Sequence, residues 1–176
     1  MKKAVFLDPE RCVGCGACVV ACMDENDIYP EKGEPPLRRV YQIEDRRISE
    51  NGIIYISIAC NHCEDSPCLI ACPTGAISRE PGSGRIVTDT SLCIGCHSCA
   101  LACPFGIPRY NAEEKMYKCT LCGDRISVGL EPACVRVCFQ EALSLESAND
   151  FQGKKEKALM ESLIKATSQK RIGFRE

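Results

Sequence analysis

Sixteen cysteines, arranged in four groups of four, constrain the fold of this 176-residue chain more than any other feature. Every group begins with the spacing C-x2-C and ends with C-x3-C. Such regular spacing in a short chain indicates a framework that the cysteines themselves hold together. The four groups are Cys12, Cys15, Cys18 and Cys22; Cys60, Cys63, Cys68 and Cys72; Cys93, Cys96, Cys99 and Cys103; and Cys119, Cys122, Cys134 and Cys138.

Disulfides are one possible framework, and the N-terminal sequence argues against them. The apolar run at residues 4–7 is too short for the hydrophobic region of a signal peptide, and no twin-arginine pair precedes it. We therefore expect a cytoplasmic protein, and thiols in the cytoplasm stay reduced. No apolar run approaches the roughly 20 residues that span a bilayer, so no direct membrane span is predicted.

Structural zinc and iron–sulfur clusters are the two other frameworks. Zinc ribbons use two C-x2-C pairs separated by a longer spacer. The first and third groups instead place three cysteines within seven residues, as "CVGCGAC" and "CIGCHSC". Such a run wraps three corners of a 4Fe–4S cubane, and C-x3-C carries the chain to a second cubane, as in two-cluster bacterial ferredoxins. Sixteen thiolates at four per cluster predict four 4Fe–4S clusters, with all sixteen cysteines as metal ligands.

Charge and motifs exclude several other functions. The net charge is −2 with no long run of one sign, so no nucleic-acid partner is expected. The sequence has no G-x-G-x-x-G and no P-loop. Four cysteines per cluster leave no iron open to a substrate, so no catalytic residue is predicted. The pattern indicates a protein that carries electrons without performing catalysis itself.

Two glycines and two histidines lie between the predicted ligands. Gly14 and Gly95 occupy the same place in their C-x-G-C loops, where a tight turn favours positive φ and aims backbone N–H groups at the cluster. His62 and His97 also lie between ligand cysteines. Because each group already supplies four thiolates, we expect both histidines to act as packing or hydrogen-bonding residues.

An internal repeat predicts the domain organisation. "DPERCVGCGACVVAC" aligns with "DTSLCIGCHSCALAC", and "CLIACPTGAIS" aligns with "CVRVCFQEALS". This indicates an α+β fold of two ferredoxin-like units. Spacing alone leaves the pairing of the groups open, but if the two central groups form one unit, the outer two must close around it. The predicted boundaries are 1–30 plus 105–150 for an outer unit, 53–104 for an inner unit, 31–52 for a loop and hairpin insertion, and 151–176 for a helical tail.

Local patterns predict the elements within these units. β-prone runs lie at 4–7, 76–78, 85–88 and 142–145, and the C-x3-C segments are expected to form single helical turns. Residues 38–45 and 53–60 are expected to pair as a hairpin around the polar stretch 46–52. Residues 154–168 are expected to form an amphipathic helix with Leu159, Leu163 and Ile164 on one face.

Three long segments carry a resemblance to a known family: "ACNHCEDSPCLIACPTGAI", "CIGCHSCALACPFGIPRYN" and "KCTLCGDRISVGLEPACVRVC". Over residues 4 to about 146 the chain resembles the four-cluster iron–sulfur subunit of molybdopterin oxidoreductases of the dimethyl-sulfoxide-reductase and formate-dehydrogenase type. The resemblance implies an electron-transfer subunit of anaerobic metabolism. It would relay electrons between a catalytic molybdenum or tungsten pterin subunit, acting on formate, an aldehyde or a sulfoxide, and another redox partner.

The resemblance also implies which cysteines share a cluster. The implied ligand sets are Cys12, Cys15, Cys18 and Cys138; Cys22, Cys119, Cys122 and Cys134; Cys60, Cys63, Cys68 and Cys103; and Cys72, Cys93, Cys96 and Cys99. The chain departs from the family pattern after Cys138, where Phe139 replaces a proline and Glu141 stands where Gly75 stands in the repeat. A different local loop is therefore expected there.

Other functions remain open on the sequence. The same series of clusters could transfer electrons in a hydrogenase or a carbon-monoxide dehydrogenase, or the chain could be a freestanding polyferredoxin. A zinc-based binding module is a further alternative. The insertion and the terminal helix favour a docked subunit, because a free carrier needs neither. The insertion and the terminal helix could bind the catalytic subunit, a second redox subunit or further copies of the chain.

Overall fold

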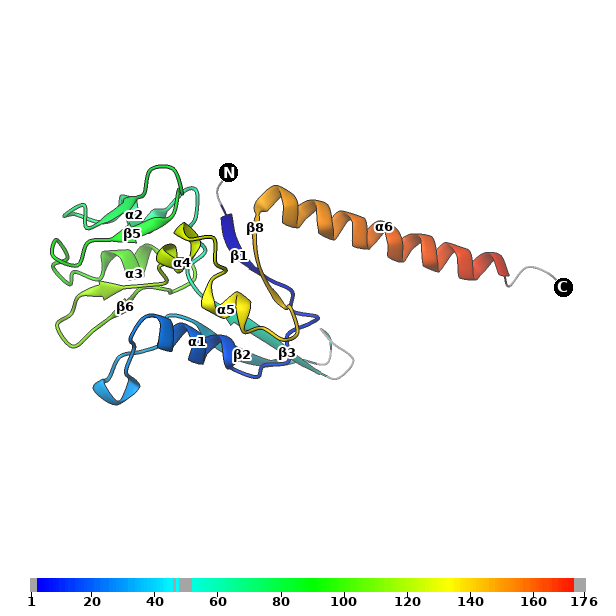
Figure 1. Cartoon of the computed structure of the whole chain (residues 1–176), viewed down its shortest axis with the longest axis horizontal. Helices are drawn as coiled ribbons and strands as arrows, with labels where there is room; N and C mark the ends of the chain where they lie inside the picture. Colours follow the sequence, from blue (N-terminus) through cyan, green and yellow to red (C-terminus); the bar gives the residue numbers. More distant parts are fainter. Residues whose placement is uncertain (1–2, 46, 48–51, 173–176) are drawn as a thin grey trace.

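A computed structural model of the chain describes residues 3–45, 47 and 52–172, with the backbone alone for residues 165–172. Short antiparallel strand pairs are interspersed with helices, which confirms the α+β class (Figure 1). The elements in chain order are β1 Lys3–Leu7, α1 Ala17–Glu25, η1 Pro30–Lys32, β2 Arg39–Glu44, β3 Ile53–Ile58, α2 Pro67–Ile70, β4 Ile77–Arg79, β5 Ile86–Thr88, α3 Ser98–Ala102, β6 Arg109–Tyr110, β7 Met116–Tyr117, α4 Gly123–Ser127, α5 Ala133–Arg136, β8 Leu143–Ser147 and α6 Ala148–Ile172.

The strands form four antiparallel pairs. β1 pairs with β8, so residues from the two ends of the body meet with Lys3 opposite Ser147. β4 pairs with β5 in the middle of the chain. The strands predicted at 4–7, 76–78, 85–88 and 142–145 are thus confirmed, within one or two residues at each end. The pair β6–β7 was not predicted, because each of its strands has only two residues.

The predicted hairpin is confirmed as β2 and β3, which pair with Arg39 opposite Ile58. Most of its turn lies outside the described residues. Val40 packs against the buried group formed by Cys18, Cys134 and Leu143, so the hairpin is part of the body.

Helical turns form at the C-x3-C segments as predicted, and they position the cysteines. α2 and α5 are single turns, while α1 continues to Glu25 because no glycine or proline interrupts "ACVVACMDE". α1 packs against α5, and α2 packs against α3. Cysteines from distant parts of the chain are thereby brought together.

The interior is small and contains many cysteines. One buried group combines Cys93 and Cys99 with the apolar side chains of Ala76, Ile77, Ile86 and Met116. The other two groups are built around Cys18 with Cys134, and around Cys22. Because so few large apolar residues are buried, whatever the cysteines bind must contribute to the core.

The terminal helix α6 is longer than predicted and reaches away from the body (Figure 1). It begins at Ala148 because the Ser147 hydroxyl accepts a hydrogen bond from the backbone N–H of Asp150 at 3.2 Å, a helix N-cap that the pattern "SAND" encodes. The ring of Phe151 stacks on Phe6 with centroids 4.4 Å apart. Among the described helices, α6 included, none combines the length and apolar character needed to cross a membrane.

Candidate metal centres

All sixteen cysteines are free thiols, and the fold gathers them in four sets that cut across the sequence groups. One cavity is lined by the cysteines of the first run together with a cysteine from the far end of the body, and we call these the Cys12 set. A second cavity is lined by the third run and one cysteine of the second group, the Cys72 set. Their members are Cys12, Cys15, Cys18 and Cys138 for the Cys12 set, and Cys72, Cys93, Cys96 and Cys99 for the Cys72 set.

Electrostatic interactions between thiols define a third group, the Cys22 set. Burial raises the pKa of Cys22 to about 12, and repulsion from three other thiols adds to this shift. Those three are close to Cys22 in space although 97 to 112 residues separate them from it in the chain. The Cys22 set consists of Cys22, Cys119, Cys122 and Cys134.

The Cys60 set is recognised in the same way. Burial raises the pKa of Cys60, with further repulsion from Cys63 and Cys103. Burial also raises the pKa of Cys68, with repulsion from Cys60 and Cys103. The Cys60 set is therefore Cys60, Cys63, Cys68 and Cys103, and each of the four sets draws its fourth cysteine from another sequence group.

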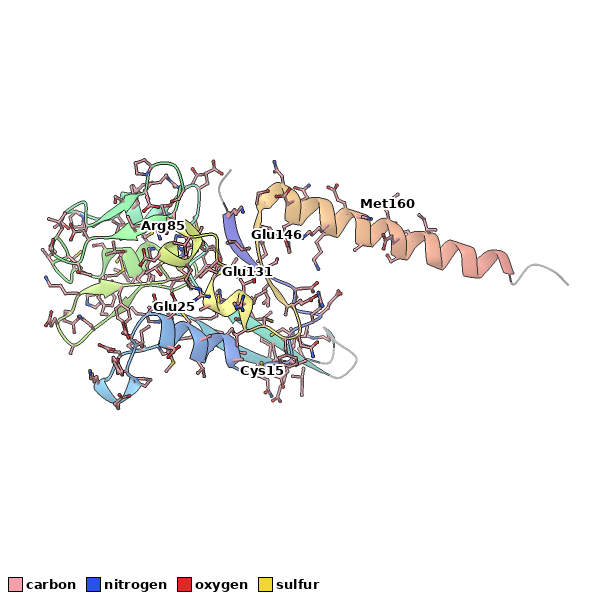
Figure 2. All side chains as sticks on the ribbon, in the orientation of Figure 1. Cys15, Glu25, Arg85, Glu131, Glu146 and Met160 are labelled. Carbon is pink, nitrogen blue, oxygen red and sulfur yellow. The ribbon has the colours of Figure 1, made fainter. Side chains whose placement is uncertain are left out.

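The four sets lie in a row. Cys134 of the Cys22 set is repelled by Cys18 of the Cys12 set, and Cys119 is repelled by Cys60 of the next set. The single turn α2 carries Cys68, and Cys72 follows it directly, so this segment joins the Cys60 and Cys72 sets. The two end sets each include an exposed cysteine, Cys15 or Cys96, and Cys15 lies at the edge of the molecule just ahead of α1 (Figure 2).

Backbone N–H groups point at the sulfur atoms. The N–H of Met116 donates to Cys93 Sγ at 3.4 Å and that of Ala142 to Cys138 Sγ at 3.2 Å. The N–H groups of His62 and Leu121 donate to the sulfurs of Cys60 and Cys119, both at 3.4 Å. Such donors stabilise thiolates and tune the potential of a thiolate-bound cluster.

Left-handed backbone conformations make these loops possible. Gly14 and Gly95 have φ of +70° and +69°, which confirms the prediction for both. A Cβ atom on Gly14 would lie 2.3 Å from the ring of Tyr55, so the loop also fits closely against β3. Only glycine satisfies both conditions at this position.

The two histidines form hydrogen bonds, as predicted. The Nδ1 atom of the fully buried His62 accepts from the backbone N–H of Ile86 at 3.0 Å. His97 Nε2 lies 2.9 Å from a carboxylate oxygen of Glu114, and its ring stacks on Tyr110 at 3.8 Å between centroids. Both side chains therefore fix the loops that carry cysteines of the Cys60 and Cys72 sets.

The different loop expected after Cys138 is not observed. Glu141 adopts φ of +50°, the same left-handed conformation as Gly75 with φ of +68°. The next residue then donates its N–H to the preceding cysteine sulfur, as in the repeat. Hydrogen bonding to sulfur thus overrides the preference of a glutamate for negative φ, and Phe139 is simply exposed.

Sequence reasoning missed two buried cations. Arg38 is 3% exposed and Lys118 is 6% exposed, and both lie among the cysteine sets. The Nε atom of Arg38 is buried and has no hydrogen-bond partner among the residues that the structure describes. Lys118 stands directly before Cys119, which was the only sequence signal, and a lysine at such a position is usually solvated.

The residues present fit 4Fe–4S clusters. Each set offers four soft thiolates with N–H donors at the sulfurs, and the buried guanidinium of Arg38 lies near the Cys12 and Cys22 sets. Within the described residues, no three cysteine, histidine or carboxylate side chains converge on a site for a single ion. A cubane, by contrast, holds one thiolate at each of four iron corners.

Comparison with known families decides the assignment. The family described as "4Fe-4S dicluster domain" matches residues 52–148, and a second family with the same description matches residues 11–77. The chain belongs to the 4Fe-4S dicluster domain family. As a member of this family the chain is a ferredoxin-like 4Fe–4S protein. The family match and the curated relatives described next together confirm the resemblance found in the sequence.

Curated relatives of this dicluster protein are subunits of anaerobic reductases and dehydrogenases. The B subunit of anaerobic dimethyl sulfoxide reductase from Escherichia coli K12 is 39% identical over 158 residues, covering 85% of this chain and 75% of the relative. "Thiosulfate reductase electron transfer subunit PhsB" of Salmonella typhi is 39% identical over 138 residues, covering 77% and 71%. "Formate dehydrogenase, nitrate-inducible, iron-sulfur subunit" of Escherichia coli K12 is 42% identical over 149 residues, covering 77% of this chain but 51% of the relative.

Among solved structures, a chain of the active-site complex BamBC of benzoyl coenzyme A reductase, determined with benzoyl-CoA, is 22% identical. The two chains superpose with a TM-score of 0.40, covering 95% of this chain and 96% of the other. This similarity is too low to add to the assignment.

Proposed function

We propose that the dicluster protein is an electron-transfer subunit with four 4Fe–4S clusters. It relays electrons between a catalytic oxidoreductase subunit, a molybdenum or tungsten pterin enzyme, and another redox partner. The observation that carries this proposal is the row of four complete cysteine sets in a chain whose relatives are named as reductase and dehydrogenase subunits. No residue of the described part is assigned a catalytic role.

The four cysteine sets are proposed as the four ligand sets. The two cavities lined by complete sets support the assignment for the Cys12 and Cys72 sets. Mutual repulsion among the thiols supports it for the Cys22 and Cys60 sets. The high pKa values of buried thiols such as Cys22 mean that cluster binding must displace their protons.

We also propose two nested ferredoxin-like units. Pairing of β1 with β8 and packing of α1 on α5 support an outer unit of residues 1–30 plus 105–150. Pairing of β4 with β5 and packing of α2 on α3 support an inner unit of residues 53–104. The insertion 31–52 and the tail 151–176 complete the chain, although β3 of the inner range pairs with β2 of the insertion.

The protein holds the clusters, shields them from water and tunes their reduction potentials. Bound clusters supply one-electron redox chemistry. All four cysteines of the Cys22 set are buried, which keeps water from that position, and the N–H···S hydrogen bonds stabilise the thiolates of the Cys22 and Cys60 sets. The exposed Cys15 and Cys96 mark the two ends of the row, where electrons would enter and leave.

Location and partners follow from the same proposal. Sixteen free cysteines suit the reducing cytoplasm, and the protruding α6 suits attachment to a larger complex. A subunit of a hydrogenase or carbon-monoxide dehydrogenase would use the same row of clusters. A freestanding polyferredoxin would differ, because it would purify without a partner.

Native anaerobic purification tests the proposal. The protein should carry about sixteen iron and about sixteen sulfide per chain, and a larger pterin-containing subunit should accompany it. Stoichiometric zinc without visible absorbance would reject the iron–sulfur assignment. Iron-loaded protein that elutes alone from every native preparation would instead favour a free polyferredoxin.

A further inference from the structure

Arg38 and Lys118 are the two cationic side chains that are buried within the described residues. Neither takes part in any of the salt bridges that the described residues form. Burying an unpaired cation is costly unless negative charge compensates it nearby. The surroundings of both residues therefore indicate where that negative charge comes from.

Arg38 lies between the Cys12 and Cys22 sets. Its Nη1 donates to the Ser57 hydroxyl at 3.0 Å, and that oxygen lies 3.4 Å from Cys18 Sγ. Cys18 packs in one buried group with Cys134 of the Cys22 set, and the Arg38 side chain hydrogen-bonds Cys134. Arg38 thus contacts the Cys22 set directly and the Cys12 set through Ser57.

Lys118 lies beside the Cys60 set. Its Nζ donates to two backbone carbonyls, that of Ile86 and, at 3.2 Å, that of Cys119. These neutral oxygens orient the ammonium group without cancelling its charge. The backbone N–H of the same Ile86 donates to His62 Nδ1 at 3.0 Å, and the His62 N–H donates to Cys60 Sγ at 3.4 Å. This chain of hydrogen bonds connects the ammonium group to the Cys60 set, where a bound cluster would supply the counter-charge.

We propose that Arg38 and Lys118 are fixed counter-charges that raise the reduction potentials of the clusters at the Cys22 and Cys60 sets, respectively. The inference rests on the proposed function. Reduction adds one negative charge to a cluster, and a neighbouring cation stabilises the more negative state. Because both cations are buried, water and salt screen this interaction weakly. The two residues act on the potential through charge, and they position no substrate.

Paired cations at the edges of the same sets provide the comparison. Arg85 Nε lies 2.6 Å from Glu80 Oε2, and Arg125 Nη1 lies 3.0 Å from Glu25 Oε2. Figure 2 shows Arg85 beside α4 and Glu25 at the end of α1. Because a carboxylate neutralises each of these arginines, their removal should change a cluster potential less than the removal of Arg38.

The experiment uses the full chain, purified anaerobically with its clusters. Redox titration monitored by electron paramagnetic resonance measures the midpoint potential of each cluster. Arg38→Gln should lower the reduced-to-oxidised ratio of the Cys22-set cluster about tenfold at a fixed potential, which is a midpoint shift of about −59 mV for one electron. Lys118→Gln should do the same at the Cys60 set. Arg38→Lys and Lys118→Arg should keep both potentials near the original values.

Controls separate charge from structure. Arg85→Gln removes a paired cation and should leave both potentials nearly unchanged. The potential of the Cys72-set cluster should stay nearly unchanged in all variants. Unmoved potentials in iron-loaded Arg38→Gln and Lys118→Gln proteins would overturn the inference while leaving the proposed function intact. A wild-type chain without clusters would instead reject the proposed function.

A neutral replacement at a buried site can prevent folding, so Arg38→Met and Lys118→Met are prepared as well. Any neutral variant that retains its iron decides the question for its site. If every neutral variant loses its cluster while Arg38→Lys and Lys118→Arg keep theirs, the residues serve cluster insertion, and the proposed role in setting the potential is wrong.

Discussion

At the scale of single residues, the cysteine loops depend on backbone conformations that most side chains avoid. Gly14 and Gly95 adopt positive φ as glycines readily do, whereas His62, Cys122 and Glu141 adopt it despite their Cβ atoms. In return, N–H groups reach the sulfurs of neighbouring cysteines. The strain is therefore concentrated where metal ligands must be held.

Replacing Gly14 with alanine should destabilise the protein by about 1–3 kcal/mol, because the new methyl group meets the Tyr55 ring and φ is positive. Gly16→Ala is the matched control. Gly16 has φ of +76° but nothing within 4 Å of the new Cβ, so that variant bears only the conformational cost. The measurement is the denaturant midpoint for loss of the visible cluster absorbance. Equal midpoints for the two variants would show that the Tyr55 contact is unimportant.

At the scale of secondary-structure elements, single helices serve two cysteine sets at once. α1 carries Cys18 on one turn and Cys22 on the next, and the two belong to the Cys12 and Cys22 sets. The start of α6 depends on a single N-cap contact, the hydrogen bond from the Asp150 N–H to the Ser147 hydroxyl. Short elements of this kind are stable only through caps, tertiary contacts and bound cofactors.

Cys22→Ser should disturb the cluster of the Cys22 set and spare that of the Cys12 set, although Cys22 follows the first run in the sequence. The reason is that Cys22 lies against Cys119, Cys122 and Cys134. Electron paramagnetic resonance of the two clusters measures the outcome, and Cys18→Ser, which should show the opposite pattern, is the control. Loss of the Cys12-set signal in Cys22→Ser would refute the exchange of cysteines.

Ser147→Ala should weaken the start of α6, because it removes the N-cap hydrogen bond to the Asp150 N–H. Loss of such a cap costs about 1 kcal/mol. Amide hydrogen exchange over the first turns of α6 should become faster. Ser162→Ala, which removes only an exposed hydroxyl bonded to the carbonyl of Leu159, should leave the exchange unchanged. Equal exchange in both variants would exclude the capping role.

At the scale of the whole molecule, a small body is stabilised from inside by what its cysteines bind, and a long helix extends from it. In the described part of the chain, the beginning of α6 contacts the body through Phe151, Lys154 and Lys155. Further along, Leu159 and Met160 are 59% and 58% exposed, and Met160 lies well out along the helix (Figure 2). Leu159, which was predicted to lie on the apolar face, therefore does not pack on the body.

Deleting residues 157–176 should leave iron content and cluster spectra unchanged, because every contact above is retained. Assembly with the catalytic partner should weaken at least tenfold, since burial of each apolar side chain is worth about 1.5–3 kcal/mol before ordering costs. Dissociation of the purified complex on dilution measures this. Phe151→Ala in the full-length chain tests separately the attachment of α6 to the body, because it removes the ring that stacks on Phe6. Undiminished assembly of the truncated protein would exclude a docking role for α6.

The sequence by itself determined the kind of protein. Four groups of C-x2-C and C-x3-C identify thiolate-bound clusters, because this spacing matches the corners of a cubane. The hairpin and four strands follow from β-prone runs and the polar turn between two of them. The positive φ of Gly14 was equally predictable, since a loop this tight demands it. In each case, residues close in the chain carry the whole signal.

Only the tertiary structure decided which side chains surround the cysteines. Arg38 and Lys118 belong to ordinary polar stretches of sequence, and nothing local shows that β2 and β7 lead them into the interior. The same is true of Ser57 beside Cys18 and of Phe151 on Phe6, which are 39 and 145 residues apart in sequence. Contacts between distant residues depend on how the elements pack. Charge and burial, the properties that set a cluster's potential, are therefore fixed by the fold, whereas ligand identity is fixed by the sequence.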